Sequence, residues 1–235
     1  GDRASSSVLS TSFEDSHSVV SGGAISSLGF LLVSASSFFN CSSEGPGGAV
    51  RTATALRADL VRPVESSVSL TASQWRGCSS GTDGGAVSMS AGVLNVSSSS
   101  FESNSAQGGG GAISTDSGTV EISSTVFQRN AAAQCGGGVR SRGGAVSVAS
   151  TLFVGNRAGG LDGGGALYVR DASTELSDIA AHGNAAPAGG GGVLKWDGAP
   201  PRIRGWRGGS LGLDCPHAAG HECACNAGYT GPNGG

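Results

Sequence analysis

The sequence has little charge, few aromatic side chains and almost no lysine or methionine. Charged residues make up 13% of the chain and aromatic residues 5%, and Lys195 is its only lysine beside a single methionine. No basic stripe is available to follow a phosphate backbone, which argues against a nucleic-acid partner. The longest apolar run, residues 28–39, is too short and too rich in serine to span a bilayer, so membrane insertion is not expected.

Glycine is abundant instead, with 43 residues in a chain of 235. Glycine-rich chains of low charge can be disordered linkers, but here Val, Ile and Leu recur at set places, which favours an ordered structure. Six cysteines beside one methionine indicate an oxidising compartment. Two N-glycosylation sequons, which begin at Asn40 and Asn95, point the same way, so we expect a secreted protein at the extracellular surface.

An internal repeat organises most of the chain. Its first landmark is an aromatic residue, and from Trp75 to Phe153 each step between aromatics is 26 residues. Nine residues after most aromatics comes a glycine doublet in a G-G-A-[ILV] tetrapeptide, as at residues 110–113. An apolar–x–apolar pair, such as Val120 and Ile122, precedes the next aromatic. The aromatic positions are Phe13, Phe38, Trp75, Phe101, Phe127 and Phe153.

Each repeat holds three short strand-like pieces, because the apolar pair alternates with period two and so indicates a strand with one buried face. Pieces of three to five residues do not fold alone, but stacked coils complete one another's burial and build parallel sheets. We predict an all-β parallel β-helix of about seven to eight coils, with ~26 residues per coil. It should cover residues 1–208, with a small cysteine-rich segment at 209–235, and its six aromatics should form an interior ladder.

The fourth position of the F-x-x-N cluster should form a corner ladder of asparagines. Its members are Asn104, Asn130, Asn156 and Asn184. An asparagine side chain can satisfy backbone groups in a left-handed turn and bond to the asparagine of the next coil. Two adjacent copies hold Cys41 and Cys78 in this slot, and a disulfide can bridge equivalent positions one coil apart. We therefore predict a Cys41–Cys78 disulfide, with two free thiols as the alternative.

The pairing of G-G-A-[ILV] with F-x-x-N resembles the repeats of the bacterial polymorphic outer-membrane proteins, over about residues 8–206. It is also similar to related right-handed parallel β-helix proteins of secreted or surface type. The resemblance implies a β-helical region used in adhesion or surface architecture, with no catalytic residues to carry over. It also implies a right-handed coil, in agreement with the rule for parallel crossovers.

The tail, residues 215–235, changes character. Its "CACNAGYTGPNGG" resembles the second half of an EGF-like module, and more closely the ephrin-receptor-like cysteine modules of large extracellular proteins of microalgae and other protists. Those modules continue to another cysteine, so Cys225 should lack its usual partner and the chain should be a fragment of a longer one. Cys215 and Cys223 are expected in disulfides, and a zinc site with the nearby histidines is the alternative.

An insertion interrupts the repeat at residues 51–65, where the spacing grows by eleven residues. Its charged members are Arg51, Arg57, Asp59, Arg62 and Glu65, of which the first four are the candidate contact residues. The insertion can be a solvated loop, or it can make a lateral contact with another chain or a glycan, because interactions on solenoids concentrate in such loops.

Catalysis is not expected. Parallel β-helices often carry polysaccharide lyases or glycoside hydrolases, whose sites need clustered carboxylates with arginine on one sheet face. The acidic candidates share no repeat phase: Asp116, Asp162, Asp171 and Glu175. We therefore expect no enzyme, no cofactor and no metal site, and keep a lyase or hydrolase only as a third alternative.

Two functional classes remain. The first is a structural subunit of an extracellular filament, surface appendage or cell coat, which associates with itself or with other extracellular structural proteins. The second is an adhesin or glycan-binding surface protein. The structural class is favoured because a β-helix has open strand edges at both ends, and neither end of this sequence shows an amphipathic capping helix.

Overall fold

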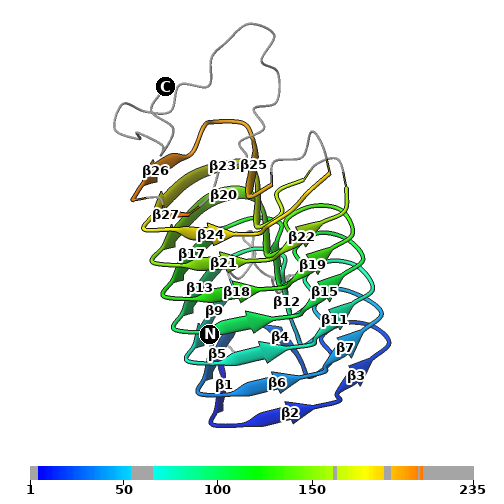
Figure 1. The fold of residues 1–235 in the computed structure, drawn as a ribbon. Coiled ribbons are helices and arrows are strands. Elements are labelled where there is room, and N and C mark those ends of the chain that lie inside the picture. The colour runs from blue at the N-terminus through cyan, green and yellow to red at the C-terminus, as the bar shows by residue number, and fades with distance from the viewer. Residues whose placement is uncertain (1–4, 54–65, 161–162, 188–191, 206, 209–235) are drawn as a thin grey trace, which may run out of the picture.

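The computed structural model describes residues 5–53, 66–160, 163–187, 192–205 and 207–208. Within these ranges the chain forms 27 strands and no helix. Every pairing between these strands is parallel, and equivalent strands stack as about 7 turns of ~26 residues. In Figure 1 the chain crosses the front from left to right and returns behind while it rises, so the coil is right-handed. The predicted fold class is confirmed.

The largest sheet has 13 strands in two columns. The first column consists of β1 (Ser5–Leu9), β5 (Phe30–Ser34), β9 (Ser67–Thr71), β13 (Val93–Ser97), β17 (Thr119–Ser123) and β26 (Arg202–Arg204). The second consists of β4 (Ile25–Leu28), β8 (Val50–Ala53), β12 (Val87–Met89), β16 (Ile113–Thr115) and β25 (Leu194–Asp197). Two long strands run through both columns and join them: β20 (Val139–Ala149) and β23 (Leu167–Ser177). We call this the long sheet.

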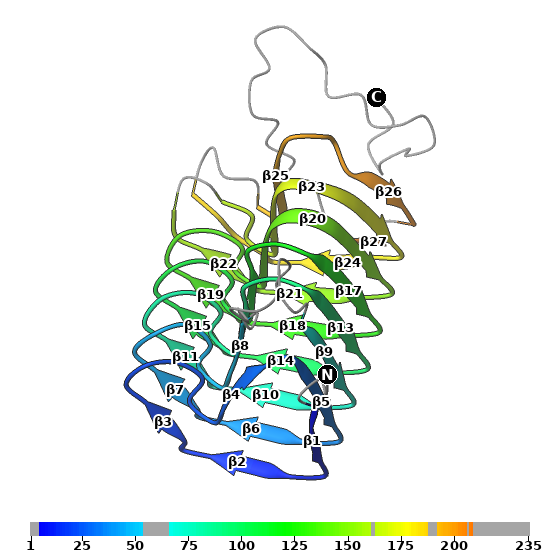
Figure 2. The ribbon, with the colours of Figure 1, turned by 180° about the vertical axis from the view of Figure 1, so that it is seen from behind.

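Two smaller sheets complete each coil, as Figures 1 and 2 show from opposite sides. The aromatic sheet consists of β2 (Ser12–Glu14), β6 (Ser37–Phe39), β10 (Gln74–Arg76), β14 (Ser100–Glu102), β18 (Val126–Gln128), β21 (Leu152–Val154), β24 (Ala180–His182) and β27 (Arg207–Gly208). The short sheet consists of β3 (His17–Ser18), β7 (Ser42–Ser43), β11 (Ser79–Ser80), β15 (Ser105–Ala106), β19 (Ala131–Ala132) and β22 (Arg157–Ala158).

The core lies between the three sheets and is filled by columns of like residues. Val120 and Ile122 of β17 are buried, whereas Glu121 between them is exposed. The register survives the insertion, because Phe38 pairs directly with Trp75 although 37 residues separate them. The eleven residues beyond the usual 26 therefore do not displace the column.

The glycine doublet is required by the corner between the short sheet and the long sheet. Gly110, the first of its doublet, has φ +69°, and a Cβ there would lie 2.2 Å from the carbonyl oxygen of Ile113. At Gly111 an added Cβ would lie 2.1 Å from the carbonyl oxygen of Gly137 in the next coil. The first glycine therefore provides the left-handed turn, and the second lets adjacent coils approach closely.

We expect Gly110→Ala to lower the free energy of unfolding by about 3 kcal/mol, because the methyl group meets backbone atoms in a left-handed conformation. Gly183→Ala is the matched control: it has φ +63° but no atom within 4 Å of its added Cβ. Gly183→Ala should lower the free energy of unfolding by only about 1 kcal/mol, because the left-handed backbone conformation of alanine is then its only cost. Urea unfolding followed by circular dichroism measures both. Equal losses would show that close approach does not constrain the doublet.

A second corner, between the long sheet and the aromatic sheet, holds a ladder of buried hydroxyls that the sequence analysis did not predict. Its members are Ser36, Ser73, Ser99, Thr125 and Thr151. Each hydroxyl donates to the carbonyl oxygen two residues earlier, at 2.7–2.8 Å. The residue before each hydroxyl has a φ of 47–49°, so this corner is turned by non-glycine residues. The hydroxyl stabilises the turn that glycine makes elsewhere.

Candidate functional site

The aromatic residues stack into one ladder inside the coil. Ring centroids lie 4.9 Å apart from Phe13 to Phe38, 4.0 Å from Phe38 to Trp75 and 5.6 Å from Trp75 to Phe101. The next two steps, through Phe127 to Phe153, are 5.0 Å each. Neighbouring planes differ by at most 9°. Five of the six rings are buried, and Phe13 at the N-terminal end is partly exposed.

The corner asparagines form a continuous hydrogen-bonded column. The Asn130 side-chain amide donates to the Phe101 carbonyl oxygen at 3.0 Å and to Asn156 Oδ1 at 2.9 Å. Its own Oδ1 accepts from the backbone N–H and the side-chain amide of Asn104, at 3.0 and 2.9 Å. The pattern recurs up to Asn184. These polar side chains therefore hold coils together and offer no groups to a ligand.

Cys41 and Cys78 continue this column but are free thiols in the structure, so the predicted disulfide is absent. Each sulfur contacts carbonyl oxygens: Cys41 that of Phe39 at 3.6 Å and Cys78 that of Phe38 at 3.7 Å. A physical reason is the stacking itself. In-register strands keep equivalent Cβ atoms about 4.8 Å apart, and a disulfide requires about 3.5–4.5 Å. The predicted disulfides of Cys215 and Cys223 fall outside the described residues.

The two thiols affect each other's ionisation. A hydrogen bond from Cys78 lowers the pKa of Cys41 to about 7, against an ordinary value of 9.0. The same hydrogen bond, followed by burial, raises the pKa of Cys78. A thiol whose pKa is lower in the folded chain than in the unfolded chain stabilises the fold as the pH rises from the folded-state pKa to the unfolded-state pKa. A raised pKa has the opposite effect above the unfolded value, because the unfolded chain then releases a proton that the folded chain keeps.

We therefore expect the free energy of unfolding to rise between about pH 7 and pH 9, owing to Cys41, and to fall above that, owing to Cys78. Ultraviolet absorbance of the thiolate should show an ionisation near pH 7 that Cys41→Ser removes. An absorbance titration that begins only near pH 9 in the folded protein would contradict this assignment.

The predicted glycosylation sites lie on the outside of the coil. Asn40 is exposed in a left-handed turn with φ 53°, and its amide donates to Asp15 Oδ1 at 2.7 Å. Asn95 is in the outward position of β13, in register with Ser69 and Glu121. It is partly buried, and its Oδ1 has no hydrogen-bond partner. Asn40 is thus the more accessible acceptor.

Of the predicted contact loop, the structure describes Arg51, which lies on β8. Arg57, Asp59 and Arg62 fall outside the described residues. Arg51 Nη1 donates to Ser88 Oγ at 2.7 Å, in the next coil. Burial lowers the pKa of Arg51, and the nearby carboxylates of Asp116 and Asp83 oppose that lowering.

A second arginine, Arg140 on β20, is 2% exposed and lies near the same two carboxylates, those of Asp83 and Asp116. Its guanidinium donates to Ser114 Oγ at 2.6 Å and forms ion pairs with Asp83 at 3.5 Å and Asp116 at 3.4 Å. Asp83 Oδ1 also accepts from the backbone N–H of Gly109. The side chains of Asp83 and Asp116 are 35% and 53% exposed, so solvent reaches the carboxylates and not the guanidinium.

These six residues are linked by hydrogen bonds and ion pairs beside the long sheet, and we call them the charged cluster: Arg51, Asp83, Ser88, Ser114, Asp116 and Arg140. Two guanidinium groups and two carboxylates balance its formal charge. Ionised carboxylates accept hydrogen bonds, so the outer side of the cluster can bind hydroxyl or cationic groups. Sequence reasoning missed it, although a signal existed: Arg51, Ser88, Ser114 and Arg140 each follow the apolar residue of a glycine tetrapeptide.

The other acidic candidates do not join the cluster. Asp171 pairs with its sequence neighbour Arg170 at 3.4 Å, and Glu175 pairs with Arg202 at 3.5 Å. Asp162 lies outside the described residues. Among the described residues no group of three His, Cys, Asp or Glu side chains is placed to hold a metal ion. The same part of the chain has no helix long and apolar enough to cross a membrane.

Comparison with known proteins supports the class of the fold. A model of the Chlamydia polymorphic membrane protein repeat matches residues 98–116. The matched segment contains Phe101, Asn104 and the tetrapeptide at 110–113. Neither the curated proteins nor the solved structures gave a match to the chain. The match and the stacked coils together define a parallel β-helix repeat protein.

Proposed function

We propose that the protein is a structural subunit of an extracellular filament, surface appendage or cell coat. The observation that carries this proposal is that the aromatic and buried polar side chains make contacts between coils. The aromatic ladder, the asparagine column and the hydroxyl corner all connect one coil to the next. Each column repeats in register, which suits a rigid rod whose role is mechanical.

Surface location is part of the same proposal. The family whose repeat model matches residues 98–116 is described as a membrane protein of Chlamydia. The exposed sequon at Asn40 and the six cysteines support secretion. The proposal also takes residues 209–235 as a partial EGF-like or ephrin-receptor-like segment with Cys215 and Cys223 in disulfides. A mobility shift after glycosidase treatment, lost in Asn40→Gln, would test secretion.

Negative-stain electron microscopy of the native secreted material tests the structural role. Regular filaments, hairs or a lattice would support it. Isolated short rods at all concentrations would contradict it and would favour a binding role instead.

The second candidate is an adhesin or glycan-binding protein, and the charged cluster favours it. Asp116 offers an exposed carboxylate that is held in place by buried Arg140. Binding of soluble polysaccharides to Asp116→Asn and to the control Glu121→Gln would test this candidate. Glu121 is an exposed carboxylate of the next strand, β17, outside the cluster. Loss of binding only in Asp116→Asn would support it, and equal binding by both variants would contradict it.

A further inference from the structure

Two exposed arginines stand side by side on the outer face of the long sheet. Arg142 of β20 and Arg170 of β23 are in register, so their backbones lie one strand spacing of about 4.8 Å apart. Both side chains are exposed, that of Arg170 at 52%. The pair lies inside the stack, because β20 also pairs with β16 and β23 also pairs with β25. Coils on both sides therefore hold the two arginines in place.

The acid next to Arg142 does not neutralise it. Asp116 directly follows β16 and, by the register of β16 with β20, stands beside Arg142. Its carboxylate pairs instead with buried Arg140, at 3.4 Å. Arg142 makes no ion pair or side-chain hydrogen bond within the described part of the chain. Like charges on neighbouring strands repel, so an unpaired guanidinium beside Arg170 is an unfavourable arrangement that a bound anion would relieve.

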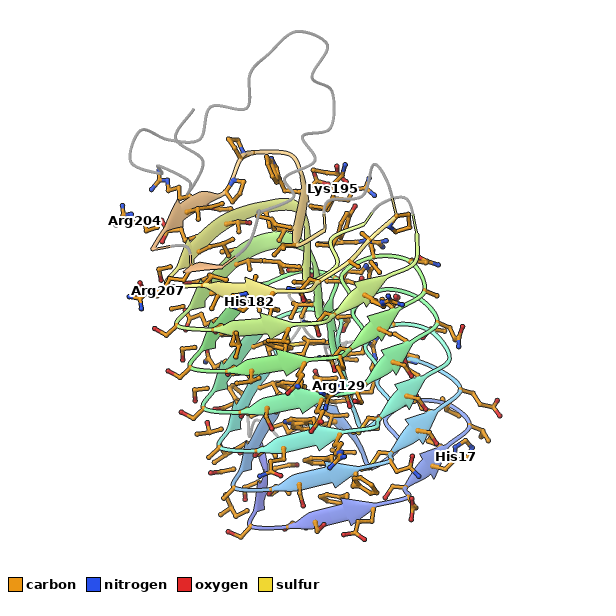
Figure 3. The ribbon with its side chains drawn as sticks, in the orientation of Figure 1. His17, Arg129, His182, Lys195, Arg204 and Arg207 are labelled. Carbon is orange, nitrogen blue, oxygen red and sulfur yellow. The ribbon has the colours of Figure 1, made fainter. Side chains whose placement is uncertain are left out.

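The acid on the other side of the pair also has a partner of its own. Asp197 of β25 is in register with Arg170, but its Oδ2 accepts a hydrogen bond from Tyr168 Oη at 2.7 Å. Figure 3 marks β25 by the labelled Lys195. Arg170 pairs with its sequence neighbour Asp171 at 3.4 Å, and these side chains are 52% and 73% exposed. Solvent weakens such a pair, so Arg170 can also bind an outside group.

The order of charges along this column is acid, arginine, arginine, acid, and it limits what can bind. Guanidinium groups bind a carboxylate through parallel hydrogen bonds. The carboxylates of Asp116 and Asp197 accept hydrogen bonds from hydroxyl groups and repel anions. A matching ligand therefore carries separated carboxylates with hydroxyls between them, as polysaccharides that contain uronate do. A nucleic acid has a phosphate at every unit and would bring phosphates against both acids.

We infer that Arg142 and Arg170 bind the carboxylate of an acidic polysaccharide, while Asp116 and Asp197 accept hydrogen bonds from sugar hydroxyls on either side. This inference rests on the second candidate function, glycan binding, and names its ligand class; it does not depend on the structural role. Gly143, directly after Arg142, leaves room beside the site. A Cβ added there would lie 3.8 Å from the nearest atom of a neighbouring coil, the carbonyl oxygen of Asp116.

Binding of hyaluronan, in which uronate sugars alternate with neutral ones, tests the site. The unmodified chain should bind it, and Arg142→Gln should weaken binding at least about tenfold, because hydrogen bonds to a charged group are lost. Arg157→Gln is the matched control, since it removes the same charge from an exposed position of β22, on the short sheet. Biolayer interferometry at one salt concentration measures all three proteins. A loss confined to Arg142→Gln supports the inference. Equal losses in both variants, or no binding by the unmodified chain, overturn it.

Asp171→Asn tests the part that Arg170 plays. The change removes the internal partner of Arg170, so hyaluronan should bind about threefold more tightly. Asparagine tolerates the left-handed conformation of this position, where φ is 52°, so the fold should not change. Unchanged or weaker binding would overturn the role of Arg170. Neutral dextran separates the two proposals: if dextran bound and hyaluronan did not, this site would be overturned and glycan binding elsewhere on the chain would stand.

Discussion

Replacing Phe127 with aspartate should unfold the coils on both sides of it. The ring is fully buried and stacks on Phe101 and Phe153 at 5.0 Å each. Truncation of a buried phenylalanine costs about 3–5 kcal/mol, and a carboxylate in the same place adds the cost of burying a charge. The total, at least about 5 kcal/mol, is comparable with the whole stability of many domains.

The control for this prediction is Phe39→Asp, because Phe39 points outward and is 47% exposed. That change should alter the free energy of unfolding by no more than about 0.5 kcal/mol. Guanidinium unfolding followed by circular dichroism measures both variants. If Phe127→Asp melted like the unmodified protein, the ring could not lie in an interior ladder.

Asn130→Leu should have the second-largest effect. Leucine is close in size to asparagine, so packing changes little, but four hydrogen bonds disappear. The Asn104 backbone N–H and the Phe101 carbonyl oxygen remain buried without these partners. Since each buried unsatisfied group costs about 1–3 kcal/mol, we expect a loss of about 4 kcal/mol in the free energy of unfolding.

Asn184→Leu provides the comparison. Asn184 makes the same contacts to the preceding coil, with Asn156 and the Phe153 carbonyl oxygen, but is only partly buried. Water can replace some of its hydrogen bonds, so its loss should be about half that of Asn130→Leu. Urea unfolding of the two variants measures both losses in the free energy of unfolding. A larger loss at Asn184 would show that burial does not set the strength of the column.

The sequence predicted those columns of the fold in which the same residue type recurs from coil to coil. Phenylalanine and asparagine recur at a fixed step, and that step is the length of one coil, so their columns could be read directly. The hydroxyl corner was missed because its slot accepts serine or threonine among many other serines. In the structure, Ser73 and Thr125 are distinguished by their burial and by the hydrogen bond that each donates to the carbonyl oxygen two residues earlier.

The carboxylates of the charged cluster could not be predicted because Asp83 and Asp116 occupy different phases of the repeat from each other and from the other four members. Asp83 precedes a glycine doublet and Asp116 follows β16, yet the long Arg140 side chain reaches both. The Cys41–Cys78 disulfide failed for the opposite reason. The two positions are equivalent, as predicted, but equivalence in a parallel stack keeps their Cβ atoms too far apart.

The pairing of Phe38 with Trp75 across the insertion has a consequence for how such a molecule can change over evolutionary time. Because the rings of Phe38 and Trp75 stack 4.0 Å apart although eleven extra residues follow β8, this position can accept new sequence without displacing the column. Whole coils can likewise be duplicated or deleted, since each end of a unit meets the same residues. The length of the rod and the insertions on its surface can therefore vary independently. The number of coils sets the length, and the corners hold the insertions.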